Sequence, residues 1–240
     1  MLCSYFVLRA DFARRRIATS NPSLAESLIA IPSLCGIVGA RIYHVLETPN
    51  LLLADPWGQL FSRYGLAWFG GLIGALAAWV VLARRNNIPL FVSLDAGSPA
   101  AALGYGIGRL GCLLSGDGDY GTPTSLPWGM SFPNGLVPTT QRVHPTPLYE
   151  LLAAVFIALI LWRIGRPDSR GSAALRAGTV FAAYLILTGA CRFLVEFIRI
   201  NPRSFFGITN AQVASGLSVA IGVALLYYLK RRGQPKPHAQ

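Results

Sequence analysis

The chain has 240 residues, of which 53% are hydrophobic and only 13% are charged, and its net charge is +11. Soluble domains average about 25% charged residues, so this composition argues against a soluble domain and predicts a protein that crosses a membrane several times. The positive charge does not indicate nucleic-acid binding, because the basic residues occur in short clusters between apolar segments rather than on one face.

In chain order, the first segment, "MLCSYFVLRADFARRR", places apolar residues before its arginines, the reverse of a cleavable signal peptide. It predicts the end of a helix, with residues 1–8 as the stub of a span. Five further segments approach the roughly 20 apolar residues that a membrane helix needs: 24–46, 66–83, 147–163, 177–199 and 208–229. Another, 90–115, is interrupted by "DAGSPA" and several glycines. We therefore predict an all-α transmembrane bundle of six full spans plus a stub. It forms a single domain over 1–232, followed by a polar tail, 233–240.

The basic residues predict the orientation of these spans. If each segment crosses once, fourteen of the twenty-one arginines and lysines fall on one side, together with the C-terminus. The opposite loops hold Arg63, Arg142 and Arg203, with Arg199 at the boundary. By the positive-inside rule the C-terminus is cytoplasmic. This orientation requires residues 90–115 to cross the membrane despite their interruption.

The cysteines and two glycine-rich motifs do not indicate a metal or cofactor. The four cysteines form no CxxC pair and lie in or beside apolar segments, so we expect buried, inert thiols. Residues 106–111 match the dinucleotide pattern GxGxxG, but no strand precedes them. The stretch "DGDYG" begins like a calcium loop and lacks its later ligands. We expect neither a metal site nor a cofactor.

Charged residues inside the apolar segments indicate a functional site. Arg192, Glu196 and Arg199 lie at i, i+4 and i+7, on one helix face, and other charges lie at Arg41, His44, Glu47, Arg109 and Glu150. Ion pairs that stabilise the bundle are the alternative interpretation. Because the arginines outnumber the carboxylates, we expect surplus positive charge facing a cavity. Such a cavity would bind a lipid phosphate, which guanidinium groups bind well.

Five motifs in order resemble the prolipoprotein diacylglyceryl transferase family over about residues 28–228. They are "GARIYHV" (39–45), "FGGLIG" (69–74), "GIGRLGCLLSGDGDYG" (106–121), "HPTPLYE" (144–150) and "CRFLVEFIR" (191–199). The resemblance implies a seven-helix enzyme of the bacterial inner membrane that needs no cofactor. Its implied partners are phosphatidylglycerol, the bilayer and a lipoprotein precursor. The enzyme would move a diacylglyceryl group from the lipid to the precursor's cysteine thiol, and glycerol phosphate would leave.

The resemblance also implies the site residues. The expected catalytic residues are Arg109, Arg192, Glu196 and Asp117. The expected substrate-binding residues are Arg199, Glu150, Tyr149, His144, Gly70, Gly71, Gly116, Gly121, Arg41 and His44. The chain departs from the family pattern at Phe69, where the family has histidine, at Cys112, where it has asparagine, and at Asp117, where it has glutamate. The loop at 116–121 is also one residue longer.

A transfer to a thiol requires a thiolate and a stabilised phosphate leaving group. We assign Arg109 and Arg192 to the phosphate and Glu196 to orienting Arg192, while Arg199, nearer the outer surface, would receive the lipid headgroup. The base stays open between His44, His144, Asp117, Asp119 and no base at all. Asp119 is otherwise expected to be a solvated loop residue. The alternative functions are a silent lipid-binding or lipid-transporting paralogue and a solute transporter. The transporter is disfavoured because only one span is visibly broken.

Overall fold

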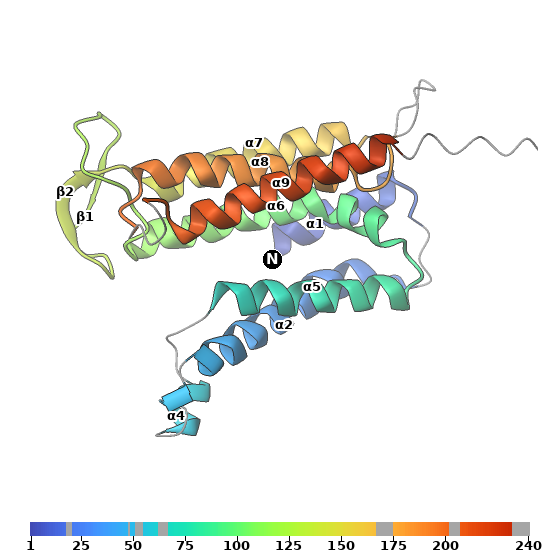
Figure 1. The fold of residues 1–240 in the computed structure, drawn as a ribbon, viewed down its shortest axis with the longest axis horizontal. Helices are drawn as coiled ribbons and strands as arrows, with labels where there is room; N and C mark the ends of the chain where they lie inside the picture. The colour runs from blue at the N-terminus through green and yellow to red at the C-terminus, as the bar shows by residue number, and fades with distance from the viewer. Residues whose placement is uncertain are drawn as a thin grey trace, which may run out of the picture. The chain divides into compact units, whose positions relative to one another are not determined.

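A computed structural model describes residues 1–17, 21–47, 49–50, 55–61, 67–166, 175–201 and 207–231. The predicted tail, 233–240, lies outside these residues. The chain divides into two compact units, Met1–Ser93 and Leu94–Gln240. The described residues are mainly helical, as the apolar composition predicts (Figure 1).

The first unit contains helices α1 (Leu2–Arg14), α2 (Leu24–Glu47), α4 (Pro56–Phe61) and α5 (Trp68–Arg85). Helix α1 extends beyond the predicted stub at 1–8. The buried carboxylate of Asp11 accepts ion pairs from Arg14 and Arg15, which stabilises the basic end of this helix. A carboxylate near the C-terminal end of a helix interacts unfavourably with the helix dipole, and the two arginines, three and four residues later, compensate its charge.

Helices α2 and α5 lie side by side with their backbones in contact (Figure 1). A Cβ atom added to Gly70 would overlap the Gly39 carbonyl and the Tyr43 side chain, and one added to Gly74 would overlap the Cys35 carbonyl. Small residues permit this close approach between membrane helices, where van der Waals packing replaces the hydrophobic effect. The paired glycines of "FGGLIG" therefore have a packing function inside the first unit.

The second unit is built from helices α6 to α9 and one pair of strands. Helix α6 (Leu90–Ser115) starts in the last residues of the first unit, and the strands β1 (Met130–Phe132) and β2 (Thr139–Val143) follow it. Helix α7 (Thr146–Ile164), helix α8 (Thr179–Val195) with the 3-10 turn η1 (Glu196–Ile198), and helix α9 (Asn210–Arg231) complete it. The antiparallel strands pair Met130 with Val143 and Phe132 with Thr139. They lie at one end of the helices (Figure 1).

The core of the second unit lies between α6, α7 and α8. Its buried members are Ala102, Ile157, Ala158, Leu161 and Val180. Gly106 of α6 faces α7, where an added Cβ would come within 2.9 Å of Ala154 Cβ. The small residues of α6 thus allow close packing against α7.

Helix α6 is also tied to the start of α8 by a buried carboxylate. The Asp95 side chain accepts hydrogen bonds from the backbone N–H groups of Gly178, at 2.9 Å, and Phe181, at 2.7 Å. The first N–H groups of a helix have no partner within the helix. Asp95 therefore caps α8 from a neighbouring helix.

The prediction that residues 90–115 form an interrupted span is wrong, since α6 is one continuous helix with Pro99 inside it. Proline inside a helix removes the hydrogen bond that its own N–H would have donated to the carbonyl four residues earlier, and its ring crowds that carbonyl. Ser98, its neighbour, donates its hydroxyl to the Leu94 carbonyl at 2.7 Å. Proline and glycine are tolerated in such helices when neighbouring helices and serine hydroxyls stabilise the backbone.

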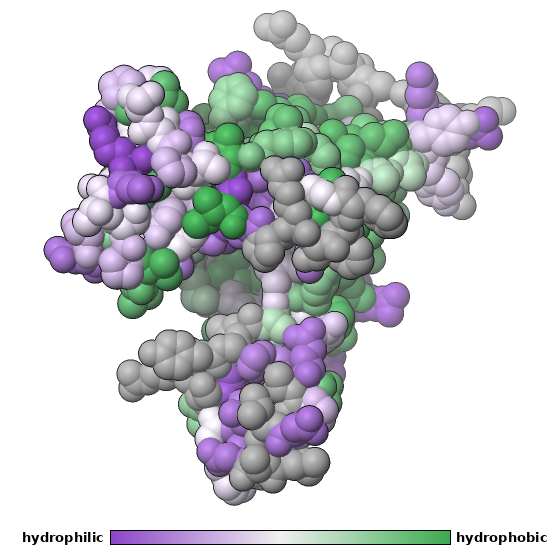
Figure 2. Space-filling model, turned by 60° about the vertical axis from the view of Figure 1, so that its left-hand side comes forward, coloured by the Kyte–Doolittle hydropathy of each residue, from purple (hydrophilic) through white to green (hydrophobic). Residues whose placement is uncertain are grey.

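Among the described residues, five helices are long and apolar enough to cross a membrane: α2, α5, α7, α8 with η1, and α9. Helix α6 is not among them, so a multi-pass helical protein is supported without the predicted count of six. Green, apolar side chains cover much of the helices of the second unit, whereas purple, hydrophilic ones gather over its strand-bearing end (Figure 2). This contrast is typical of a bundle that ends in a polar cap.

The expectation of buried thiols is wrong. All four cysteines are free, Cys3 is exposed, and Cys35, Cys112 and Cys191 are partly exposed. The reason is that the outer faces of the helices are themselves apolar. An apolar neighbourhood in the sequence therefore does not require burial inside the protein.

Candidate functional site

Six charged residues that the sequence disperses over 90 positions meet in the second unit. They lie near the C-terminal end of α6, at the start of α7, at the end of α8 and on the connection between α6 and α7. We call them the arginine cluster; its members are Arg109, Asp119, Glu150, Arg192, Glu196 and Arg199. The fold places them beside the polar, strand-bearing end of the unit.

Glu150 is the centre of the arginine cluster. Its carboxylate lies 3.7 Å from Arg109 Nη1, 3.6 Å from Arg192 Nε and 3.4 Å from Arg199 Nη1, and its side chain is only 1% exposed. The Tyr105 hydroxyl donates a hydrogen bond to Glu150 Oε1 at 2.6 Å. One carboxylate at the start of α7 thus attracts guanidinium groups from both α6 and the end of α8.

Glu196 is the second buried carboxylate. It forms an ion pair with Arg192, one helical turn earlier, and lies 3.6 Å from Arg199 Nε. Asn201 Nδ2 donates a hydrogen bond to Glu196 Oε1 at 2.7 Å. The contact expected from the i, i+4 spacing of Arg192 and Glu196 is therefore present, and Glu196 fixes the orientation of that guanidinium.

Asp119 provides the third carboxylate and bridges Arg109 and Arg199. Its own backbone carbonyl accepts a hydrogen bond from Thr146 Oγ1 at 2.5 Å. Burial alone would raise the pKa of the Asp119 carboxyl, but the guanidinium groups of Arg199 and Arg109 hold that pKa below its ordinary value. The expectation of a merely solvated loop residue is wrong, because the loop folds back onto both arginines.

A short stretch of backbone pairing holds this loop in place. Gly121 and Arg199 form an isolated antiparallel bridge, and Gly121 N–H donates to the His144 carbonyl at 2.8 Å. A Cβ on Gly121 would overlap the Ile198 carbonyl and the His144 and Thr146 side chains, so only glycine fits there. Gly116 has φ +55°, a conformation that favours glycine. Both glycines expected in substrate binding thus have structural roles in shaping the loop.

Asp117 lies beside the cluster rather than within it. Its Oδ1 accepts a hydrogen bond from the Asp119 backbone N–H at 3.2 Å, which is a local turn contact. A carboxylate oxygen of each aspartate and the Cys112 sulfur lie within 4.8 Å of one another. A cation at that point would compete with the two guanidinium groups already bound to Asp119, so these three residues do not indicate a metal site.

His144 and Tyr149 lie at the start of α7, beside Trp128 of the connection. Trp128 Nε1 donates to the Tyr149 hydroxyl at 2.9 Å, and that hydroxyl lies 3.2 Å from His144 Nδ1. Their positions near Glu150 follow from the motif "HPTPLYE". The structure thus joins the two expected substrate-binding residues through a hydrogen bond.

The expected surplus of positive charge does not occur in the arginine cluster. Three arginines face three carboxylates, because Asp119 adds the negative charge that the sequence analysis had assigned to solvent. The side chain of Arg199 is 4% exposed, against 24% for that of Arg109. The loop that pairs with Arg199 covers it.

Two guanidinium N–H groups of the cluster retain unused capacity. Within the described part of the chain, the buried Nε atoms of Arg109 and Arg199 have no hydrogen-bond partner. Buried donors without acceptors are rare in folded proteins. Arg199 Nε still lies within ion-pair distance of Glu196, so the cluster holds two donors whose hydrogen-bonding capacity is not fully used.

The remaining predicted site residues, Arg41, His44, Gly70 and Gly71, belong to the first unit, and so does Phe69. Arg41 is buried and Phe69 is exposed. The arginine cluster is formed without any of them.

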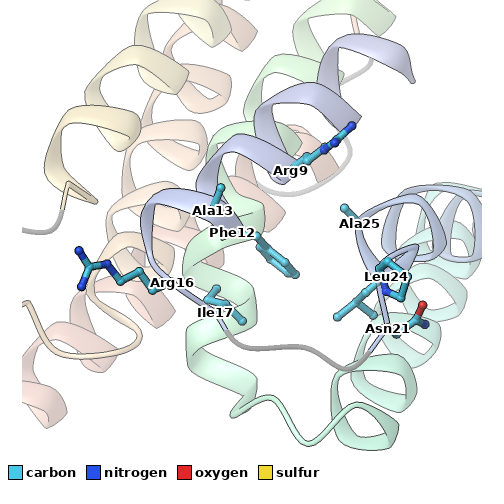
Figure 3. A pocket seen from close by; sticks show the side chains of 9 residues that line it. Arg9, Phe12, Ala13, Arg16, Ile17, Asn21, Leu24 and Ala25 are labelled. Carbon is cyan, nitrogen blue, oxygen red and sulfur yellow. The ribbon is translucent and has the colours of Figure 1, made fainter.

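The first unit also contains a cavity of about 230 Å³, between α1 and the start of α2 (Figure 3). Phe12, Ile17 and Leu24 give it an apolar lining, and the basic residues that line it are Arg9 and Arg16. No carboxylate or thiol is among its lining residues. It lacks groups for acid–base or thiol chemistry and is not the candidate site.

Comparisons with known proteins identify the family of the chain. The sequence model of the family described as "Prolipoprotein diacylglyceryl transferase" matches residues 1–228. A protein of Geobacter sulfurreducens named phosphatidylglycerol–prolipoprotein diacylglyceryl transferase is 33% identical over 230 residues, which cover 94% of this chain and 83% of that protein. The chain belongs to the prolipoprotein diacylglyceryl transferase family.

Further relatives carry the same name. The protein of Bordetella parapertussis is 33% identical over 230 residues, covering 92% of this chain and 83% of its own length. That of Dehalococcoides mccartyi is 34% identical over 215 residues, covering 87% and 77%. The resemblance found from five motifs is thus confirmed.

The sequence indicated neither the contacts of Tyr105 nor the ion pairs of Asp119, which had been considered only as a candidate base or a solvated loop residue. Tyr105 precedes Arg109 by one helical turn, and its ring lies 5.1 Å from the Arg109 guanidinium. The i, i+4 spacing was a usable signal for that contact. Asp119 offered no such signal, since its partner Arg199 is 80 residues away.

Proposed function

We propose that this chain transfers the diacylglyceryl group of phosphatidylglycerol to the cysteine thiol of a lipoprotein precursor. The observation that carries the proposal is the convergence of Arg109, Arg192 and Arg199 on one buried carboxylate, beside apolar helices, in a protein of this family. Guanidinium groups bind phosphate oxygens through paired hydrogen bonds. The cluster therefore suits a phospholipid whose acyl chains remain among the helices.

In this mechanism the thiolate sulfur attacks the glyceryl carbon that bears the phosphate. A carbon–sulfur bond forms, the carbon–oxygen bond breaks, and glycerol phosphate leaves with the electron pair. Arg109 and Arg192, whose side chains are 24% and 25% exposed, would hold the phosphate together with Arg199, which shares Asp119 and Glu150 with Arg109. Fixed donors at the departing oxygen stabilise the transition state because they need little reorganisation.

The carboxylates of the cluster act as positioning residues in this proposal. Glu196 orients Arg192, and Glu150 holds all three guanidinium groups in one place. Asp117 is our candidate for receiving the proton of the precursor's cysteine thiol. Its carboxylate lies beside the arginine cluster, near the Cys112 sulfur.

The substrate-binding assignments are part of the same proposal. Tyr149, His144, Gly116 and Gly121 would shape the entrance in the second unit. The substrate-binding residues proposed within the first unit are Arg41, His44, Gly70 and Gly71. Each assignment predicts a change in the KM for the lipid or the peptide when that residue is replaced.

We place the protein in the bacterial inner membrane with its C-terminus in the cytoplasm. The clusters of basic residues support this orientation through the positive-inside rule. The arginine cluster, at the opposite ends of the helices from the basic C-terminal end of α9, would then face outward, where lipoprotein precursors emerge.

The direct test uses membranes that contain this full chain, phosphatidylglycerol labelled in its glyceryl group, and a peptide with a lipobox cysteine. We expect label on the cysteine and release of glycerol phosphate. Lipid binding is measured in parallel. Binding without transfer from a correctly inserted protein would contradict the proposal and support a silent lipid-binding paralogue.

A further inference from the structure

The three carboxylates of the arginine cluster differ in their access to the surroundings. The side chains of Glu150 and Glu196 are 1% and 0% exposed, whereas that of Asp119 is 30% exposed. The two glutamates lie on α7 and η1, while Asp119 lies on the connection between α6 and α7. Asp119 is therefore the one carboxylate of the three that an arriving ligand meets.

The charge balance requires a carboxylate to move when a phosphate binds. The cluster holds three guanidinium groups against three carboxylates. A phosphodiester adds one negative charge, and an uncompensated charge at a partly buried site is costly. Loss of one carboxylate from the arginines restores the balance, since a carboxylate and a phosphodiester carry the same charge.

The backbone around Asp119 is fixed, so its side chain can leave by rotation alone. Thr146 Oγ1 holds the Asp119 carbonyl, and the Gly121–Arg199 bridge holds the residues that follow. When the carboxylate leaves, it frees the two donors that it had accepted hydrogen bonds from, Arg109 Nη1 and Arg199 Nη2. These donors then converge on the position that the carboxylate had occupied.

We infer that Asp119 is a displaceable counter-ion, which occupies the phosphate position between Arg109 and Arg199 in the empty enzyme and returns to that position to expel the phosphate product. The inference rests on the proposed function. It makes Asp119 a residue that sets the affinity for the substrate phosphodiester and for the released phosphomonoester. The monoester carries more negative charge than the diester, so the returning carboxylate opposes its retention more strongly.

The test compares wild type with Asp119→Asn and Asp119→Glu in the full-length protein. The KM for phosphatidylglycerol in vesicles is measured, together with inhibition by glycerol phosphate and by inorganic phosphate. We expect Asp119→Asn to lower the inhibition constant of glycerol phosphate about tenfold, which corresponds to about 1.4 kcal/mol. We also expect a lower KM for the lipid. Asp119→Glu retains the charge and should resemble wild type in both constants.

Unchanged or higher constants in Asp119→Asn would overturn the inference, because they would mean that Asp119 only supports the arginines. Tighter inhibition by inorganic phosphate with an unchanged lipid KM would overturn it too, since the site would then take free anions rather than the lipid. Asp119→Ser is a second uncharged variant, and thermal melting shows which variants are folded.

A binding measurement separates this inference from the proposed function. Retention of labelled glycerol phosphate by the protein needs no turnover. If wild type transfers no label, the proposed function fails. Tighter retention by Asp119→Asn than by wild type would still support the counter-ion, and equal retention would overturn it.

Discussion

Arg109 and Arg192 have similar exposure but different surroundings, and this difference predicts their roles. Arg109 contacts Asp119, Glu150 and the ring of Tyr105. Arg192 contacts the two buried glutamates. Displacement of Asp119 therefore changes the surroundings of Arg109 and leaves the contacts of Arg192 intact. We expect the Arg192 side chain to keep its position when the phosphate binds and the Arg109 side chain to exchange one carboxylate for the phosphate.

We expect Arg109→Ala to reduce transfer by about 100-fold to 1,000-fold, the usual effect of removing one donor at a departing oxygen. Arg109→Lys should also fail, because a single ammonium cannot replace a planar guanidinium that bridges two carboxylates. Label transfer in membranes measures both variants. The matched control is Arg142→Ala, since Arg142 is exposed and donates only to the Gly129 and Pro127 carbonyls. Retained activity in Arg109→Ala would remove this residue from the mechanism.

At this scale the sequence predicted the contact of Arg192 with Glu196, but it did not predict the ion pairs of Asp119. The helical spacing of Arg192 and Glu196 determines their contact. In "GDGDYG", however, both aspartates lie in a glycine-rich loop, where no period indicates direction. The backbone pairing of Gly121 with Arg199 and the hydrogen bond from Thr146 to the Asp119 carbonyl hold Asp119 next to the arginines.

Among the elements, α2 and α5 provide a test that separates packing from substrate binding. A Cβ on Gly70 would overlap the Gly39 backbone, whereas one on Gly71 would make ordinary contacts, at 3.4 Å to the Gly36 carbonyl and 3.5 Å to Ala40 Cβ. Gly70→Ala should therefore lower the free energy of unfolding by about 1–3 kcal/mol, and Gly71→Ala should change it little. Denaturant unfolding of the purified protein measures both. Equal stability of the two variants would contradict the packing role.

The cap that the Asp95 side chain of α6 forms on the start of α8 provides a second test at the level of the helices. We expect Asp95→Ala to destabilise the protein by about 2 kcal/mol, because it leaves the N–H groups of Gly178 and Phe181 without their acceptor. Asp95→Asn keeps an acceptor oxygen and should have a smaller effect. Amide hydrogen exchange at the start of α8 reports the change directly; unchanged protection in Asp95→Ala would argue that other acceptors serve these groups.

The boundaries of the long helices follow closely from apolar length. The segments predicted at 24–46, 147–163 and 208–229 correspond to α2, α7 and α9 within two residues at each end. The strands β1 and β2 were not predicted. They are short, and their pairing depends on contacts with each other rather than on a local pattern.

For the whole molecule, the orientation in the membrane is the main prediction. A fluorescent protein fused after residue 231 should be active, because it would fold in the cytoplasm, and alkaline phosphatase at the same position should be inactive. Alkaline phosphatase inserted between β1 and β2 should be active. The reverse pattern would contradict the orientation inferred from the basic residues.

Composition and charge alone predicted a helical, multi-pass protein, and they could not determine the number of spans. Helix α6 shows the reason. It is continuous over Leu90–Ser115 and contains Asp95, Pro99 and several glycines, and it is not among the described helices that are long and apolar enough to cross a membrane. Hydropathy reports the apolar character of side chains, whereas residues 95–100 of α6 are buried against protein.

The pairing of Gly121 with Arg199 also bears on how this loop tolerates insertions. In a β-bridge, successive side chains point to opposite faces. If the pairing shifted by one residue at Gly121, another residue would lie opposite Arg199, and its side chain would point to the other face. Upstream, Gly116 and Gly118 both have positive φ and can absorb a change in length. Residues added before Asp119 would lengthen the loop without altering the register at the arginines, while residues added after Gly121 would disrupt it.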